Sequence, residues 1–275
     1  MTPGTVARPG RIIAFTMLLL GGVAMIMPIV FMLVTSFKSN SEIYELHFLP
    51  RAPTLDNYAS VLGHSPFGRW FLVSFTVATA TTLSVLFFDS LVGYTLAKFR
   101  FSGRGIVFVA ILSTLMIPTE MLVIPWYVMA KTMGWLDTIW GIMSPGMMTG
   151  FGVFLMRQFF LGVPDELIDA ARVDGLSEFR IFWEVALPLV TPALSALAIF
   201  AFLGNWTAFL WPLIVTTSPK LYTVPVGLAS LSGEFGTDWE MIMTGSSIAT
   251  IPTLVVFIVL QRNIINGIML TGLKG

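Results

Sequence analysis

The sequence lacks cysteine altogether and carries few charges for its length. Without cysteine, disulfides, thiolate metal sites and cysteine nucleophiles are excluded. Only 11% of the 275 residues are charged, whereas about 25% are charged in an average soluble domain. The 15 basic and 15 acidic residues balance to a net charge of zero, so nothing indicates a nucleic-acid partner.

Apolar residues, in contrast, are abundant. They make up 56% of the chain, which includes 23 Phe and 16 Met, and the mean hydropathy is +0.85. A soluble chain of this size cannot bury so much apolar surface, because a small fold has too much surface for its volume. The composition therefore predicts an integral membrane protein whose solvent is the lipid bilayer.

The long apolar runs predict how the chain crosses the bilayer. A helical span needs about 20 mostly apolar residues. Six stretches qualify, and the fourth is interrupted by glycines and Pro145, which predicts a packed position inside a bundle. The first stretch is too long for the apolar region of a signal peptide, so we expect a retained helix. The predicted spans are residues 12–37, 70–97, 106–129, 138–160, 192–216 and 241–260.

The distribution of lysine and arginine predicts the orientation. Basic residues concentrate on the cytoplasmic side of membrane proteins. With six spans, most lysines and arginines fall on the side that carries both termini. We therefore expect the N and C termini to be cytoplasmic. The basic residues on that side are Arg8, Arg11, Lys98, Arg100, Arg104, Arg157, Arg172, Arg180, Arg262 and Lys274.

A polar segment at about residues 161–190 lies on the same side and predicts two short helices. Pro164 suits a first helical turn, and Asp165 and Glu166 follow where acids complement the helix dipole. Gly175 suits a left-handed C-terminal cap, and Ser177 suits the N-cap of the second helix. Apolar residues of that second helix recur at helical spacing and form one apolar stripe, namely Phe179, Phe182, Trp183, Ala186 and Leu187.

Two interpretations of this segment remain open on periodicity alone. An amphipathic helix can lie among lipid headgroups at the membrane surface. It can equally dock into a groove on a soluble partner.

A resemblance to a known family favours docking. The segment resembles the EAA loop of permease subunits of bacterial ABC importers, whose pattern is E-A-A, a glycine and then I-x-L-P. The chain has Asp169-Ala170-Ala171, Gly175 and Val185-Ala186-Leu187-Pro188 at the family's spacings. Asp169 replaces glutamate and Val185 replaces isoleucine, and both replacements are conservative.

The resemblance extends over nearly the whole chain, to the maltose-type permeases of the carbohydrate-uptake branch. The usual Trp-Asn pair in the fifth span is Trp206-Thr207 here. The supporting stretches are residues 53–58, 93–104, 116–118, 158–160, 206–213 and 261–275.

The resemblance implies an all-α protein with the type I ABC importer permease fold, in which residues 1–275 form a single transmembrane domain in the bacterial inner membrane. It implies half of a heterodimeric pathway, formed with a second permease, two ATPase subunits and an extracytoplasmic binding protein. ATP and Mg²⁺ would be bound by the ATPases, since this chain has no phosphate-binding loop. The chain itself would be neither an enzyme nor a cofactor or metal carrier. The residues implied in coupling to the ATPases are Glu166, Asp169, Ala170, Ala171, Asp174, Gly175, Leu187 and Pro188.

Polar residues in or near the spans are candidates for the substrate path, because ionisable groups in a membrane are costly. Glu120 either lines the pore or lies at a hydrated helix end. Asp89 either pairs with the partner permease or serves transport. Asn205, Trp206 and Thr207 offer hydroxyl-binding and sugar-stacking surfaces, while ordinary aromatic packing explains Trp residues equally well.

The sequence therefore predicts a permease subunit of an ATP-driven importer for a sugar or sugar derivative. A permease for an anionic or phosphorylated polyol or sugar, similar to glycerol-3-phosphate, is the first alternative. An ATP-independent secondary transporter is the second, although such proteins show paired repeats and broken helices, and no repeat is evident here. A structural membrane scaffold is the third.

Overall fold

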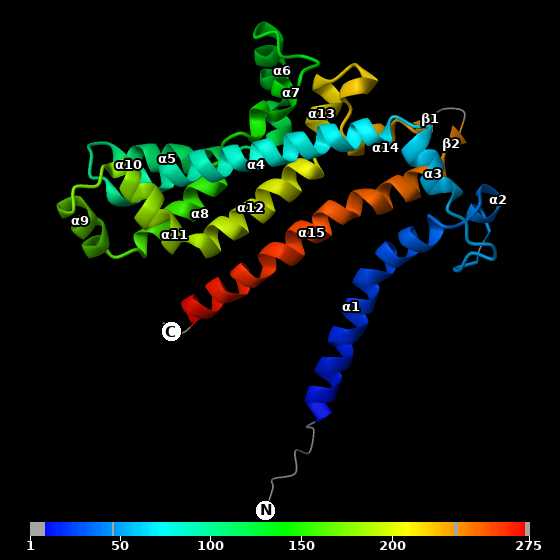
Figure 1. The fold of residues 1–275 in the computed structure, drawn as a ribbon, viewed down its shortest axis with the longest axis horizontal. Helices are drawn as coiled ribbons and strands as arrows, with labels where there is room; N and C mark the ends of the chain where they lie inside the picture. Colours follow the sequence, from blue (N-terminus) through cyan, green and yellow to red (C-terminus); the bar gives the residue numbers. More distant parts are fainter. Residues whose placement is uncertain (1–8, 46, 234–235, 273–275) are drawn as a thin grey trace, which may run out of the picture. The chain divides into compact units, whose positions relative to one another are not determined.

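The computed structural model describes residues 9–45, 47–233 and 236–272, and this part of the chain is almost entirely helical (Figure 1). The strands found there are β1 (Ser232–Gly233) and β2 (Gly236–Thr237), an antiparallel pair of two residues each. The prediction of an all-α protein is confirmed apart from this short hairpin.

Within the described residues, three helices are long and apolar enough to cross a membrane without a break. They are α1 (Pro9–Thr35), α4 (Phe67–Lys98) and α15 (Trp239–Gly272). They coincide with the first, second and sixth predicted spans.

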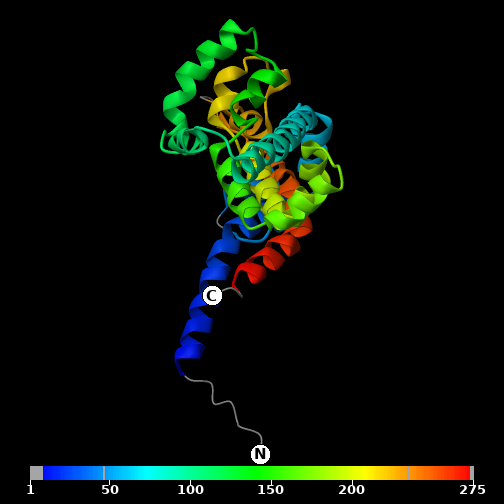
Figure 2. The ribbon, with the colours of Figure 1, turned by 90° about the vertical axis from the view of Figure 1, so that its left-hand side faces the viewer.

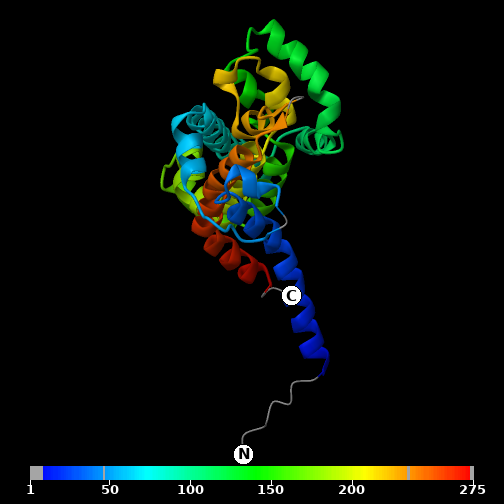
Figure 3. The same ribbon diagram turned by 90° about the vertical axis from the view of Figure 1, so that its right-hand side faces the viewer.

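The other candidate spans are bent pairs of helices, so the described residues contain up to six spans. The third predicted span is wrong as one continuous helix: α5 (Arg104–Thr114) and the segment Thr119–Thr132, which contains α6 (Val123–Thr132), meet at 94°. Figure 2 and Figure 3 show this sharp bend. Pro118 is the last residue of the break, and its ring cannot continue a regular helix.

The fourth predicted span breaks where glycine and proline interrupt it. Residues Ile139–Gly146, which begin with α7 (Ile139–Met143), meet α8 (Gly150–Leu161) at 48°. Gly146 and Gly150 lie on either side of the break.

The fifth predicted span is shorter than residues 192–216, because α12 ends at Trp206 and α13 is separate. Before α12, the helical segment Glu178–Leu189 joins it at an angle of 86°. The elements here are α10 (Glu178–Arg180), a π-helical turn (Ile181–Ala186), α11 (Leu187–Leu189), α12 (Thr191–Trp206) and α13 (Leu210–Val215).

Residue contacts divide the chain into two units, and the first contains Met1–Phe67 and Leu228–Thr250. In it, the amide of Asn57 donates to the main-chain carbonyls of Ser36 (2.9 Å) and Lys38 (2.8 Å), just beyond the end of α1. Asn57 belongs to α3 (Asp56–Gly63). Further short helices are α2 (Asn40–Ile43), in the same unit, and α14 (Val224–Ala229), which contains residues of both units.

The second unit, Gly68–Gly227 with Ile251–Gly275, contains two hydrophobic cores that both include residues of α4. The first core joins α4, α8, α12 and the segment at 163–190. Its buried residues are Val85, Tyr94, Ala97, Met156, Phe160, Val163, Ile168, Ala171, Ile181, Phe182, Ala186, Val190, Ala193 and Leu197. The second core joins α4, α6, α7 and α13, through Val73, Val77, Ala130, Ile142, Met143 and Val215.

Candidate functional site

The segment at residues 161–190 forms the two helices that the sequence predicts. The first, α9, runs over Asp165–Val173 directly after Pro164, with Asp165 and Glu166 in its first turn. Ser177 caps the second helix, since its hydroxyl accepts a hydrogen bond from the main-chain amide of Arg180 (3.5 Å).

Gly175 forms the corner between these helices. Its φ is +81°, in the left-handed region that glycine adopts without a steric penalty. The amides of Gly175 and Leu176 donate to the carbonyls of Arg172 (3.0 Å) and Ala171 (3.1 Å), which satisfies the end of α9.

The apolar stripe of the second helix divides between two environments. Phe182 and Ala186 are buried, whereas Phe179 and Trp183 are more than half exposed. Ile181, which the spacing did not select, is fully buried. The reason is the π-helical turn at Ile181–Ala186, whose wider turns change which residues share a face.

An aromatic contact fixes the second helix to the spans. The ring of Phe182 lies 5.4 Å from that of Tyr94 in α4 and 6.3 Å from that of Phe160 in α8, between ring centroids. Tyr94 and Phe160 are themselves 5.4 Å apart in an edge-on arrangement. All three side chains are fully buried. The segment is therefore part of the first core rather than a loosely attached loop.

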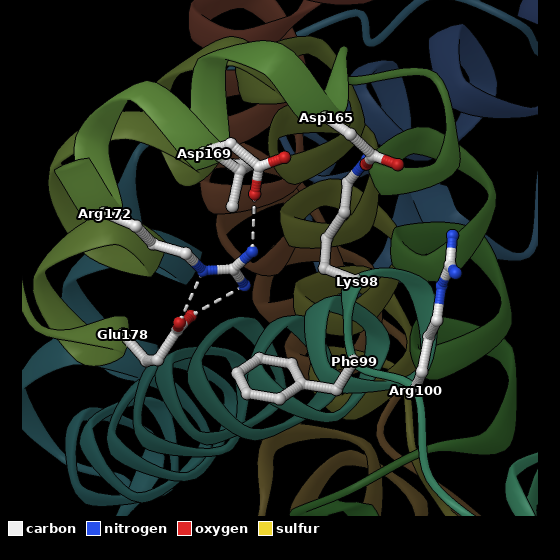
Figure 4. Close-up of a pocket in the computed structure, with 8 residues that line it drawn as sticks. Lys98, Phe99, Arg100, Asp165, Asp169, Arg172 and Glu178 are labelled. Atoms are coloured by element: carbon white, nitrogen blue, oxygen red, sulfur yellow. Dashed lines mark hydrogen bonds and ion pairs between the residues drawn. The ribbon is translucent and has the colours of Figure 1, made fainter.

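Ion pairs surround a polar cavity of about 520 Å³ between the end of α4 and α9 (Figure 4). The Lys98 ammonium donates to Asp165 (2.6 Å) and to the carbonyl of Val163 (2.5 Å). The Arg172 guanidinium donates to Glu178 (2.7 Å) and Asp169 (2.8 Å), so it connects α9 to the next helix. These contacts hold the two ends of α9 in place.

The charges of this cluster are mutually stabilised. Hydrogen bonding and attraction from Lys98 hold the pKa of Asp165 below its usual range, and Arg100 and Arg172 add to the effect. Hydrogen bonds to Glu178 and then to Asp169 raise the pKa of Arg172 above its usual value. Because the pKa of Asp165 is lowered, its pair with Lys98 is complete above the ordinary carboxyl pKa and is lost as the pH falls through the lowered one.

We expect the substitution Lys98→Met to raise the pKa of Asp165 toward its ordinary value, since the principal cation beside it is removed. Carbon-13 NMR of the labelled aspartate carboxyl, titrated in detergent micelles, measures this shift. Lys98→Arg retains a cation and is the control. An unchanged titration of Asp165 in Lys98→Met would show that Lys98 is not the cause.

Apolar side chains on the outer surface of the segment are left uncovered by the part of the chain that the structure describes. Val173, the last residue of α9, is 87% exposed. Leu167, Phe179 and Trp183 are also exposed. Exposed apolar residues gathered on one short segment are typical of an interaction surface.

The residues predicted to couple the chain to an ATPase lie in two environments. Leu187 is partly buried against the first core, and Ala171 belongs to that core, so both face the chain itself. Asp169 is exposed although it accepts a hydrogen bond from Arg172. The exposed members of the set are Glu166, Asp169, Ala170, Asp174, Gly175 and Pro188.

The predicted path residues lie in different environments. Trp206 is buried by Phe71 and Phe202, whose ring centroids lie 5.3 and 5.8 Å from its own. The side chains of Asn205 and Thr207 donate to main-chain carbonyls one turn earlier in α12. Glu120 is exposed, in the 3₁₀ turn Thr119–Leu122.

Sequence reasoning missed Lys98 and Arg172 as parts of this site. Both were counted only as basic residues of one membrane side. Lys98 was missed because its partner Asp165 lies 67 residues away in the sequence. The signal for Arg172 was its spacing of three residues from Asp169 on one helix.

Comparisons with known proteins agree with this architecture. The arabinooligosaccharides transport system permease protein AraQ of Bacillus subtilis (strain 168) is 37% identical over 90% of both chains. The sn-glycerol-3-phosphate transport system permease protein UgpE of Pectobacterium atrosepticum is 31% identical over 94% of this chain and 95% of the relative.

Solved structures show the same fold. A bacterial ABC transporter involved in the import of the acidic polysaccharide alginate has a chain that matches with a TM-score of 0.83 at 23% identity, over 95% of this chain and 99% of that chain. The family of binding-protein-dependent transport system inner membrane components matches residues 89–266, which include α8 to α14 and the segment at 161–190. The chain therefore belongs to this family of ABC importer permeases and is a membrane transport protein.

Proposed function

We propose that the chain is the permease subunit of an ATP-driven importer and forms part of the pathway for a sugar or sugar derivative. The observation that carries the proposal is the segment at 161–190. It exposes acidic and apolar side chains, while Phe182 and the ion pairs of Lys98 and Arg172 fix it to the spans. A rigidly attached docking surface transmits movement of a partner to the helices.

The names of two relatives support two candidate substrate classes. AraQ belongs to a transport system for arabinooligosaccharides, and UgpE to one for sn-glycerol-3-phosphate. The higher identity with AraQ favours a neutral oligosaccharide. The similarity to UgpE supports an anionic polyol derivative as the second candidate.

The proposed mechanism is rigid-body switching driven by the ATPases. The exposed residues of the segment, Asp169 and Ala170 among them, contact an ATPase subunit. Gly175 sets the angle between the helices that contact it. Ala171 and Leu187 act from within, where they pack the segment on the first core. Closure of the ATPase dimer moves the helices only if ATP binding favours one state over the other.

The proposed assembly has a second permease, two ATPase subunits that bind ATP and Mg²⁺, and an extracytoplasmic binding protein. The family supports the ATPases and the binding protein, and the second permease follows from the heterodimeric organisation that the sequence resemblance implies. We place both termini and the segment at 161–190 on the cytoplasmic side of the inner membrane, on the distribution of Lys and Arg. We treat residues 1–275 as one permease domain, because α15 contains residues of both units.

The substrate path is proposed to include Asn205, Thr207 and Glu120. Glu120 and Thr207 are exposed, and Asn205 is partly exposed beside the break at the end of α12. Trp206 shapes this region by packing, since its ring is almost completely buried.

Purification of the chain with its partners from native membranes, followed by reconstitution in liposomes, tests the proposal. We expect an ATPase and a second permease to co-purify. We expect ATP-dependent uptake of a radiolabelled arabinooligosaccharide in the presence of the binding protein, with labelled glycerol-3-phosphate as the competing candidate. Uptake by the isolated chain without ATP would contradict the proposal and support a secondary transporter.

A further inference from the structure

A band of polar residues crosses the middle of α4, between the parts of that helix that belong to the two cores. Asp89, Thr81 and Ser90 are fully buried there. Buried polar groups inside a membrane span are costly and require a partner or a function. On either side of the band, Val77 contributes to the second core and Tyr94 to the first.

The band faces the break in the fourth span. The break, residues 147–149, leaves backbone groups without the hydrogen bonds that a continuous helix provides. The hydroxyl of Ser84 donates to the carbonyl of Met147 (2.7 Å). The main-chain amide of Thr149 donates to both carboxylate oxygens of Asp89 (3.1 Å each). The two sides of the break are therefore both held by α4.

Asp89 and Thr149 form a relay of hydrogen bonds at the start of α8. The Thr149 hydroxyl donates to Asp89 (2.7 Å) and accepts from the amide of Gly152 (2.9 Å). A Cβ at Gly152 would lie 2.0 Å from a carboxylate oxygen of Asp89, so only glycine leaves room for the contact. The carboxylate thus has a hydrogen-bond partner within this chain.

The break separates the two cores along the fourth span. Before it, Ile142 and Met143 of α7 pack in the second core, and after it Met156 and Phe160 of α8 pack in the first. The first core includes the segment at 161–190. The break is therefore the point at which movement of that segment is either passed to the second core or absorbed by bending.

We propose that Asp89 is a positioning residue that locks this break, so that α7 and α8 move as one body during transport. Its carboxylate fixes Thr149, while Ser84 fixes Met147 on the opposite side. The lock passes the displacement of the segment at 161–190 to the second core. This consequence rests on the proposed coupling role, whereas the lock itself does not depend on the substrate.

Pairs of spin labels test the lock directly. The chain has no native cysteine, so Trp140→Cys on α7 and Leu161→Cys at the end of α8 place two labels that are unique within it, at positions that are 61% and 47% exposed. The partner subunits are used in cysteine-free form. Double electron–electron resonance then measures their separation in the complete transporter, without nucleotide and after trapping with ATP and vanadate. For wild-type Asp89 we expect one narrow distance distribution that is unchanged between the two states.

Thr149→Val and Thr149→Ser form the matched pair of variants. Valine has the shape of threonine without the hydroxyl, and serine retains the hydroxyl. We expect loss of the single narrow distribution in Thr149→Val and its recovery in Thr149→Ser. Asp89→Asn should give an intermediate result. The asparagine amide keeps one oxygen that can accept from Thr149, but its NH2 group is a donor and cannot replace the second carboxylate oxygen.

Separate measurements distinguish the possible failures. Thermal melting and co-purification of the ATPase show whether each variant is folded and assembled. If Asp89→Asn does not fold or assemble, Thr149→Val and Thr149→Ser still test the lock. A narrow, nucleotide-independent distribution in folded Thr149→Val would overturn the proposal. So would a wild-type distance that shifts with nucleotide. If the lock is found but ATP-driven uptake is not, the proposed function fails and the positioning role stands.

Discussion

The substitution Phe182→Ala is expected to loosen the packing of the segment at 161–190 against the spans and to lower the free energy of unfolding. Its ring is fully buried against Tyr94 and Phe160. Replacing a buried phenylalanine with alanine typically costs about 3–5 kcal/mol, since it removes apolar contacts and leaves a cavity. The π-helical turn that contains Phe182 adds sensitivity, because its backbone geometry is held by packing. Denaturant or thermal unfolding in detergent measures the loss.

Trp183→Ala is the matched control for this prediction. It removes a larger side chain from the next position, but Trp183 is 53% exposed. We expect little change in unfolding free energy, since exposed apolar atoms lose little on truncation. If the exposed surface docks on an ATPase, Trp183→Ala instead weakens ATPase binding. Equal destabilisation by both variants would contradict the burial pattern on which the first core is based.

Local chemistry made the segment at 161–190 predictable. Gly175, Ser177 and the acids after Pro164 each act within a few residues of themselves, through a cap, a left-handed turn or the helix dipole. The structure confirms these assignments at Gly175 and Ser177. The positions of the three unbroken spans were predictable for the same kind of reason, because a long apolar run is itself the signal.

Features that depend on distant contacts were not predictable in this way. The π-helical turn places Ile181 inside and Trp183 outside, although helical spacing grouped Trp183 with Phe182 in one apolar stripe. The bend of 94° after α5 was missed as well, since Pro118 alone does not give the direction of the following helix. In both cases the surrounding packing decides between geometries that the local sequence permits.

The role of Asp89 shows the same limit. Its cost inside a span indicated a function, but the sequence left open a partner permease or the transported molecule. The structure instead brings Thr149 to it from 60 residues away. A break in a neighbouring span creates the need for a buried acceptor. The sequence contained both features, the acid and the interrupted span, without the pairing between them.

Gly175→Val is expected to reduce ATPase binding strongly while the spans remain intact. Gly175 has a φ of +81°. A left-handed residue with a side chain costs about 1–2 kcal/mol, and a β-branched one is among the least tolerated. No atom lies within 4 Å of a Cβ built there, so the cost arises in the backbone rather than from a clash. Relief of that strain changes the angle between α9 and the following helix, on which the proposed docking surface depends.

Gly175→Asn isolates this effect, because asparagine is similar in size to valine and tolerates the left-handed region. If the whole backbone strain of about 1–2 kcal/mol is subtracted from the binding free energy, the valine variant loses roughly 5- to 30-fold in ATPase affinity. Titration of the labelled ATPase onto the permease in nanodiscs measures it. The asparagine variant should bind close to wild type. Equal loss in both variants would mean that the ATPase rejects any side chain at this corner, so that direct contact rather than backbone angle makes glycine necessary there.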